Sequence, residues 1–176
     1  MSGRPVVLDA SAAIAMIRRE PAGPIVLEVL RASAAMNARL LVPDAFWLEL
    51  VNVLVRRYSL RSKEVLEAVR DMDDFGLESI RIDRPLLLVA IDLQSRYGLS
   101  AYDAIYLALA EAEDARLLTL DRGLATAAGS RAVDLPGLGE KRLSEEPATY
   151  GEPIDWAEFG PYLARLRAEA RETVES

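Results

Sequence analysis

Two aspartates stand directly after short apolar runs, where an acidic side chain needs a structural or a chemical reason. Asp9 ends the run V-V-L-D, and Asp121 ends the run L-L-T-L-D. Such runs predict buried strands, and in open parallel sheets ligands bind at the carboxyl ends of the strands. Either aspartate alone is explained as a turn or helix-cap residue. Because two strand ends carry one, the pair favours a site at one edge of a sheet.

A third acid, Glu49, lies in a predicted helix and projects from a mainly apolar face. Its neighbours three and four residues away are Ala45, Phe46, Asn52 and Val53. Burying an unpaired charge among such residues is costly. A bound cation, a hydrogen-bond partner or a raised pKa must therefore compensate the Glu49 carboxylate.

A fourth acid, Asp103, has a simple structural explanation. The stretch S-A-Y-D that begins at Ser100 has the spacing of a capping box, which would place Asp103 at the third position of a helix. The sequence leaves two interpretations of Asp103 equally open, a cap alone and a cap that is also a ligand.

The composition limits the chemistry that these four acids can perform. The chain has no histidine and no cysteine, which excludes imidazole acid–base chemistry, disulfides and metal sites built from those residues. Any metal must be held by oxygen ligands, which suit Mg²⁺ or Mn²⁺. Such a site can activate a water, orient it toward a phosphorus and neutralise charge on the leaving oxygen. The pattern thus indicates phosphodiester hydrolysis.

The net charge of −7 is an objection to a nucleic-acid partner, since affinity for phosphates comes from cations. Residues 140–176 carry nine acids and five bases, so much of the excess lies in the tail. Cations bound by several of the remaining acids would bring the rest of the chain closer to neutral. Lysine is scarce, so arginine is expected to make any phosphate contacts.

The elements that position the acids alternate between strand and helix. Strands are predicted at residues 5–9, 39–43, 78–82 and 116–120, with a small last strand at 132–135. Helices are predicted at residues 12–19 with Ser11 as N-cap, at 25–34, 45–58, 61–75 with Ser62 as a cap, 85–97 and 100–111, and a short one after Asp121. This order predicts an α/β fold with a mostly parallel sheet of four to five strands.

The four acidic stretches together resemble those of the PIN-domain nucleases, and within that family the VapC-type toxins of type II toxin–antitoxin systems. The similarity covers residues 5–136 and rests on V-V-L-D-A-S-A-A-I-A, E-L-V-N-V-L-V-R-R, L-S-A-Y-D-A-I-Y-L-A-L-A and L-L-T-L-D-R-G-L-A. It implies a three-layer α/β/α domain and metal-dependent endoribonuclease activity.

The resemblance also implies roles for individual residues. Asp9 and Asp103 would be the principal Mg²⁺ ligands, which Mn²⁺ could replace, with Glu49 and Asp121 completing the catalytic site directly or through water. Three polar residues fit supporting positions: Ser11, Asn52 and Thr119. Each also has a simpler explanation: Ser11 as N-cap, Thr119 as a strand residue and Asn52 as an exposed polar residue.

The chain divides into a PIN-like domain at residues 1–139 and a C-terminal extension at 140–176. Within the extension, residues 145–153 are predicted to be a linker and 155–172 an amphipathic helix. That helix carries Trp156, Phe159, Tyr162, Leu163 and Leu166. So much apolar surface requires a partner face, on its own domain or on a neighbouring subunit.

The leading hypothesis is therefore a Mg²⁺-dependent RNase toxin that acts on RNA, is inhibited by a cognate antitoxin and forms a homodimer. No apolar run approaches the length of a membrane span, so the protein is expected in the cytoplasm. One alternative is a housekeeping RNA-processing nuclease without an antitoxin, and a small neighbouring gene for a DNA-binding antitoxin would separate the two. Another is a noncatalytic scaffold that binds RNA or protein.

Overall fold

The centre of the fold is a parallel sheet of short strands. A computed structural model of the chain describes residues 3–136. The sheet has the order β3-β2-β1-β4, and every strand pair in it is parallel. The strands are β1 (Val6–Leu8), β2 (Leu40–Pro43), β3 (Glu78–Ile80) and β4 (Arg116–Leu118). The predicted α/β class and the sheet of four to five parallel strands are confirmed.

The predicted last strand at 132–135 is wrong. The chain there makes only an isolated parallel bridge between Leu117 and Ala132, in which the Val133 N–H donates to the Leu117 carbonyl at 2.8 Å. Pro136 follows and has no N–H to continue a ladder. The segment therefore covers the edge of β4 without extending the sheet.

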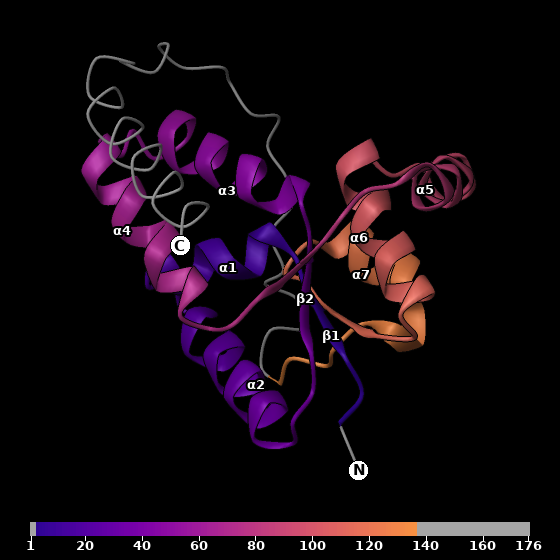
Figure 1. Ribbon diagram of the computed structural model, residues 1–176, viewed down its shortest axis with the longest axis horizontal. Coiled ribbons are helices and arrows are strands. Elements are labelled where there is room, and N and C mark those ends of the chain that lie inside the picture. Colours follow the sequence, from indigo (N-terminus) through magenta and orange to yellow (C-terminus); the bar gives the residue numbers. More distant parts are fainter. Residues whose placement is uncertain (1–2, 137–176) are drawn as a thin grey trace, which may run out of the picture.

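Helices cover both faces of the sheet, as the predicted three-layer arrangement requires (Figure 1). One layer contains α1 (Ala10–Ile17), α2 (Gly23–Ala35), α3 (Ala45–Arg56) and α4 (Ser62–Asp73). The other contains α5 (Arg84–Tyr97), α6 (Ala101–Ala112) and α7 (Arg122–Ala128), which a 3₁₀ turn at Gly129–Arg131 follows. Within residues 3–136, no helix is long and apolar enough to cross a membrane.

Several helices begin at positions other than those predicted. Helix α1 starts at Ala10 with Asp9 at the N-cap position, so the prediction of Ser11 as N-cap is wrong. Ser62 is the first residue of α4 rather than its cap, and the Arg61 N–H donates to the Glu64 carboxylate at 2.9 Å. No side chain caps the start of α1, and the Ser11 hydroxyl makes other contacts, to Asp9 and to the Leu120 N–H.

The core lies between the sheet and its helices. The side chains of Val6, Val7 and Leu8 are fully buried, as expected for a central strand covered on both faces. Helix α6 is buried from Ala104 to Ala110, which explains why its sequence is apolar almost all round. The strands begin at one end of this core and finish at the other, and polar groups gather at both ends.

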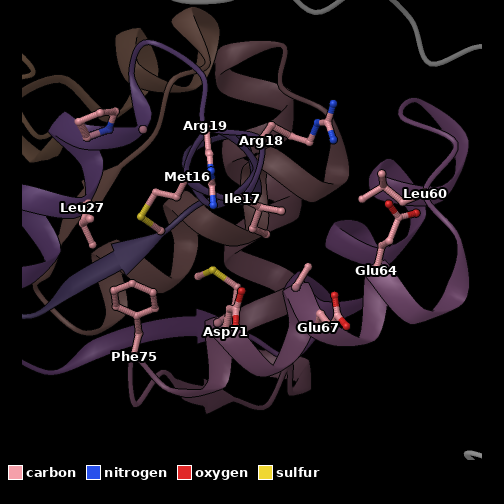
Figure 2. A pocket seen from close by; sticks show the side chains of 14 residues that line it. Met16, Ile17, Arg18, Arg19, Leu27, Leu60, Glu64, Glu67, Asp71 and Phe75 are labelled. Carbon is pink, nitrogen blue, oxygen red and sulfur yellow. The ribbon is translucent and has the colours of Figure 1, made fainter.

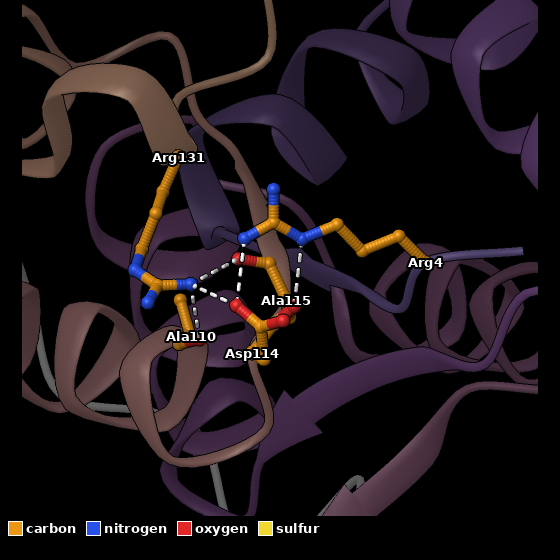
Figure 3. Close-up of polar contacts among 5 residues, drawn as sticks. All are labelled: Arg4, Ala110, Asp114, Ala115 and Arg131. Atoms are coloured by element: carbon orange, nitrogen blue, oxygen red, sulfur yellow. Dashed lines mark hydrogen bonds and ion pairs between the residues drawn. The ribbon is translucent and has the colours of Figure 1, made fainter.

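At the amino edge of the sheet, Asp114 holds two arginines (Figure 3). Arg4 donates to the Asp114 carboxylate and carbonyl, each at 2.8 Å, and Arg131 donates to the same carboxylate at 2.9 Å. Hydrogen bonds from Arg131 and Arg4 lower the pKa of Asp114. These contacts join the segment before β1, the turn before β4 and the end of the described chain, all at the edge opposite to Asp9 and Asp121.

Substitution of Leu117 by alanine should destabilise the domain strongly. Leu117 is fully buried in β4, so its loss leaves a cavity and should lower the free energy of unfolding by about 2–5 kcal/mol. Leu48, which is 75% exposed on α3, offers the matched control, and Leu48→Ala should change stability by no more than about 0.5 kcal/mol. Urea denaturation measures both. Equal effects would contradict the placement of Leu117 in the core.

Candidate active site

Asp9 is a buried carboxylate at the carboxyl end of β1. Its side chain is only 3% exposed. One carboxylate oxygen, Oδ2, accepts hydrogen bonds from the hydroxyls of Ser11 and Thr119, the second at 2.6 Å. These bonds keep a buried charge satisfied. Directly after Asp9 the chain turns from β1 into α1.

The two hydroxyls that hold Asp9 also join the ends of β1 and β4. Ser11 Oγ accepts from the Leu120 N–H at 3.0 Å, and Thr119 Oγ1 accepts from the Asp121 N–H at 3.0 Å. Ser11 and Thr119 therefore each donate to the carboxylate and accept from the backbone after β4. The structure brings both predicted supporting residues to Asp9.

Asp121 begins α7 as its N-cap, and its side chain accepts from the Leu124 N–H. The helix-cap interpretation is therefore confirmed for this residue. The cap does not take Asp121 away from the other acids, because it lines the same small cavity as Asp9 and Asp103.

Asp103 occupies the third position of α6, and Ser100 is the N-cap of this helix, as the spacing predicted. The Ser100 hydroxyl donates to Asp103 Oδ2 at 2.6 Å and accepts from the Asp103 N–H at 3.1 Å. The pKa of Asp103 is raised above its usual value. Burial is the main cause and the charge of Asp121 adds to it, while the hydrogen bonds with Ser100 act in the opposite direction. Asp103 is thus a cap whose carboxyl also faces the acidic cavity.

Glu49 has a hydrogen-bond partner that the sequence interpretation missed. The Tyr106 hydroxyl donates to Glu49 Oε2 at 2.6 Å. Burial, followed by the charges of Asp9 and Glu49, raises the pKa of Tyr106 above its usual value and keeps the hydroxyl a donor. Tyr106 lies three residues after Asp103 in α6, so helical spacing alone could have placed it beside the cluster.

The four predicted acids line one cavity of about 80 Å³ at the carboxyl edge of the sheet. Asn52 does not line it and is exposed on α3, so the structure does not bring Asn52 to the acids. This exposure agrees with the simpler explanation of Asn52 as an exposed polar residue.

Three further polar side chains, which the sequence did not single out, line the cavity: Glu20, Arg57 and Tyr58. Arg57 is the C-cap of α3 and follows Glu49 by two steps of four residues, through Val53, which also lines the cavity; this spacing was a usable signal. Glu20 lies in the loop after α1, and its carboxylate accepts from the Tyr58 hydroxyl at 3.0 Å. No local pattern connects Glu20 with Tyr58, because only the fold brings them together.

The electrostatics of the cavity show that its acids repel one another. Burial raises the pKa of Asp9 to about 6, hydrogen bonds from Ser11 and Thr119 oppose that shift, and the charges of Asp103 and Asp121 add to it. A proton or a cation relieves such crowding.

The donor set suits a hard cation that keeps water. Within residues 3–136, no three acidic side chains meet closely enough to form a ready-made metal cage. Mg²⁺ is commonly bound by one or two carboxylates and several waters, so it does not need such a cage. Oxygen ligands alone and mutually repelling carboxylates fit an ion of this kind.

The family model that describes the PIN domain matches residues 6–130. The chain therefore belongs to the PIN domain family. No curated protein sequence matches this chain.

Solved structures of similar fold include a toxin–antitoxin complex from Klebsiella pneumoniae. That chain is 18% identical, with a TM-score of 0.53, over 73% of this chain and 96% of the other. VapBC2 from Rickettsia felis, bound to a DNA fragment from its promoter, is 16% identical with a TM-score of 0.55 over 66% and 87% of the two chains.

A third similar structure is VapC20 from Mycobacterium tuberculosis, a toxin that cleaves the sarcin–ricin loop. It is 14% identical, with a TM-score of 0.51, over 81% of this chain and 99% of the other. At these identities the likeness shows the fold.

Asp9→Asn should change how stability depends on pH in metal-free buffer. The pKa of Asp9 is raised from 3.8 to about 6, so the folded state holds this proton more tightly than the unfolded state. The Asp9 contribution should therefore lower the free energy of unfolding as the pH rises from about 4 to about 6, by on the order of 3 kcal/mol. Asp9→Asn removes that loss and should be more stable than wild type at neutral pH.

Urea denaturation across this pH range measures the difference. Asp92→Asn is the control, because Asp92 is exposed and pairs only with Arg96 one turn away, and it should follow the wild-type profile. If the free energy of unfolding of Asp9→Asn depends on pH in the same way as that of wild type, the pKa of Asp9 is not raised in the folded state.

Proposed function

We propose that this protein is a Mg²⁺-dependent endoribonuclease and the toxin of a type II toxin–antitoxin pair. The observation that carries the proposal is the convergence of Asp9, Glu49, Asp103 and Asp121 on one cavity at the carboxyl edge of a PIN-domain sheet. PIN domains are generally nucleases, and the sarcin–ricin loop that VapC20 cleaves is RNA. An oxygen-only donor set suits hydrolysis of phosphodiester bonds.

Asp9 and Asp103 would be the principal ligands of the metal, with Glu49 and Asp121 contributing directly or through water. When bound, the cation supplies Lewis-acid activation of water and neutralises charge on the leaving oxygen; Mn²⁺ can substitute for Mg²⁺. Ser11 and Thr119 hold Asp9 Oδ2 in place, which fixes the direction in which the carboxylate presents its oxygens. Tyr106 does the same for Glu49.

Arg57 gives the acidic cavity a positive group at its edge. It is the only arginine among the residues that line this cavity in the described part of the chain. A guanidinium there can bind a backbone phosphate of RNA and offset the repulsion between the substrate and the acids. In this proposal, Arg57 positions the substrate and the acids carry the reaction.

The antitoxin partner is proposed from the structural relatives, two of which are toxin–antitoxin complexes. With RNA as substrate and such a partner, we place the protein in the cytoplasm. A housekeeping RNA-processing nuclease would share the same acids, and a noncatalytic scaffold would share the same fold. Sequencing of RNA ends after induction of wild type and of Asp103→Asn distinguishes a toxin with one or few targets from a general processing enzyme.

Asp103→Asn should abolish cleavage. Full-length protein incubated with RNA and Mg²⁺ or Mn²⁺ should cut it, and the substitution should lower the rate at least about 100-fold because it removes a charged ligand. Asp92→Asn, which changes an exposed acid in the same layer, should cleave at the wild-type rate. EDTA should stop the reaction.

Two outcomes of this assay contradict the proposal. In the first, wild type cuts no RNA with either metal, which favours the noncatalytic scaffold. In the second, wild type and Asp103→Asn cut equally, so that the activity does not come from this site.

We also propose that the protein forms a homodimer through α5. This helix exposes Leu87, Leu88, Val89 and Ile91, and Leu88 is 59% exposed. Such an apolar face is unfavourable in water and typical of a subunit interface. Leu88→Glu should convert a dimer to a monomer in light scattering, whereas Met36→Glu, at an equally exposed position on the far end of α2, should not. A monomeric wild type at micromolar concentration would exclude this interface.

A further inference from the structure

A groove with a volume of about 840 Å³ lies between α4 and the pair α1 and α2 (Figure 2). Its floor is apolar and is formed by Met16, Ile17, Leu27, Leu60, Met72 and Phe75. In Figure 2, Met16, Leu27 and Phe75 lie together at one end, and Leu60 lies at the other. An open apolar groove of this volume is large enough for several side chains of a helix.

The groove is distinct from the acidic cavity. Arg18 lines the groove and stacks over the ring of Tyr58 at 4.7 Å, while the Tyr58 hydroxyl donates to Glu20. Glu20 and Tyr58 in turn line the acidic cavity. These three side chains form a wall between the two, so an occupant of the groove need not contact the four acids.

The two walls of the groove carry opposite charges. Along α4, Glu64, Glu67 and Asp71 line one wall at intervals of three and four residues, which places them on one face of the helix. At the end of α1, Arg18 and Arg19 line the other wall. A matching occupant therefore has an apolar stripe with a basic flank on one side and an acidic flank on the other.

The C-terminal sequence of this chain has that pattern. When residues 155–172 are projected as a helix, Trp156, Phe159, Leu163 and Leu166 form an apolar stripe. Arg167 and Arg171 flank the stripe on one side, and the opposite flank carries Glu158 and Glu169. The sequence thus offers both the apolar surface and the two charged flanks that the groove requires.

We propose that residues 155–172 bind in this groove of the same chain, with Arg167 and Arg171 against the acidic wall of α4. Residues 137–155 can span up to about 60 Å when extended, which exceeds the size of a domain of this length. A covalently attached segment has a high effective concentration, so it occupies the groove ahead of most free ligands. The proposal does not depend on the nuclease activity proposed above.

Disulfide trapping tests the proposal directly because the chain has no cysteine of its own. Two groove pairs are made in the full chain, Leu27→Cys with Leu163→Cys and Phe75→Cys with Phe159→Cys. The control pair, Thr126→Cys with Leu163→Cys, places the first cysteine at an exposed position of α7, in the layer on the other face of the sheet. A disulfide forms only when the two Cα atoms come within about 7 Å, so each pair reports a defined position of the tail.

We expect at least one groove pair to form an intrachain disulfide under mild oxidation at low micromolar protein, and the control pair to form little. Non-reducing electrophoresis and peptide mass mapping measure this. No disulfide in either groove pair, or equal trapping in the control, would overturn the proposal. Disulfides that join two chains would show that the tail docks on a second copy, which also overturns it.

A charge exchange tests the predicted orientation. Glu67→Lys, in the background of whichever groove pair forms a disulfide, should slow trapping about tenfold, because it repels the basic flank of the tail. Adding Arg167→Glu to Glu67→Lys should restore the rate of disulfide trapping, since the positive and negative charges have then changed places. Glu67 is exposed, so neither change should unfold the domain. Failure of the second substitution to restore the rate would exclude contact between Arg167 and the α4 wall.

Discussion

The carboxylate of Asp9 is the constraint on which the arrangement of the carboxyl edge depends. It lies almost entirely out of water, and two hydroxyls donate to the same oxygen. Each hydroxyl also accepts from the backbone beyond β4, so the hydrogen bonding of one acid determines how two strand ends meet. A parallel sheet makes this possible, because all its strands deliver their carboxyl ends to the same edge.

This arrangement costs stability, and the cost follows from its chemistry. A carboxylate with a pKa of about 6 is held in its less favourable charged form near neutral pH, and neighbouring acids make this worse. A fold selected for stability alone would place an apolar side chain at that position. The acids of the cavity are therefore most simply explained by a positively charged ligand.

Much of this edge could be predicted from the sequence, since strand ends and helical periodicity are local properties. Local patterns predicted Asp9 and Asp121 at the ends of apolar runs. They also predicted Ser100 as the helix cap three residues before Asp103. Contacts that depend on three-dimensional packing were not predicted. Tyr106 reaches Glu49 from another helix, and Glu20 meets Tyr58 only after folding.

The errors in the sequence interpretation have local causes. Ser11 was assigned to the helix start because serine is a good N-cap, but the helix begins two residues earlier than predicted and the Ser11 hydroxyl donates to Asp9 instead. Asn52 lies near the same face of α3 as Glu49, but its side chain is exposed and does not line the cavity, which agrees with its simpler explanation as an exposed polar residue. The predicted last strand had the composition of a strand but met a proline after one bridge.

The hydrogen bond from Tyr106 to Glu49 connects helices from opposite layers of the fold. Helix α6 lies on one face of the sheet and α3 on the other, and this bond joins them across the carboxyl edge (Figure 1). Sliding of one layer against the other would stretch the bond and move the Glu49 carboxylate relative to Asp103, which belongs to the same helix as Tyr106. The distance between the Glu49 and Asp103 carboxylates therefore depends on how the two helical layers are placed relative to each other. A molecule that displaces α3 would change this distance without touching either acid.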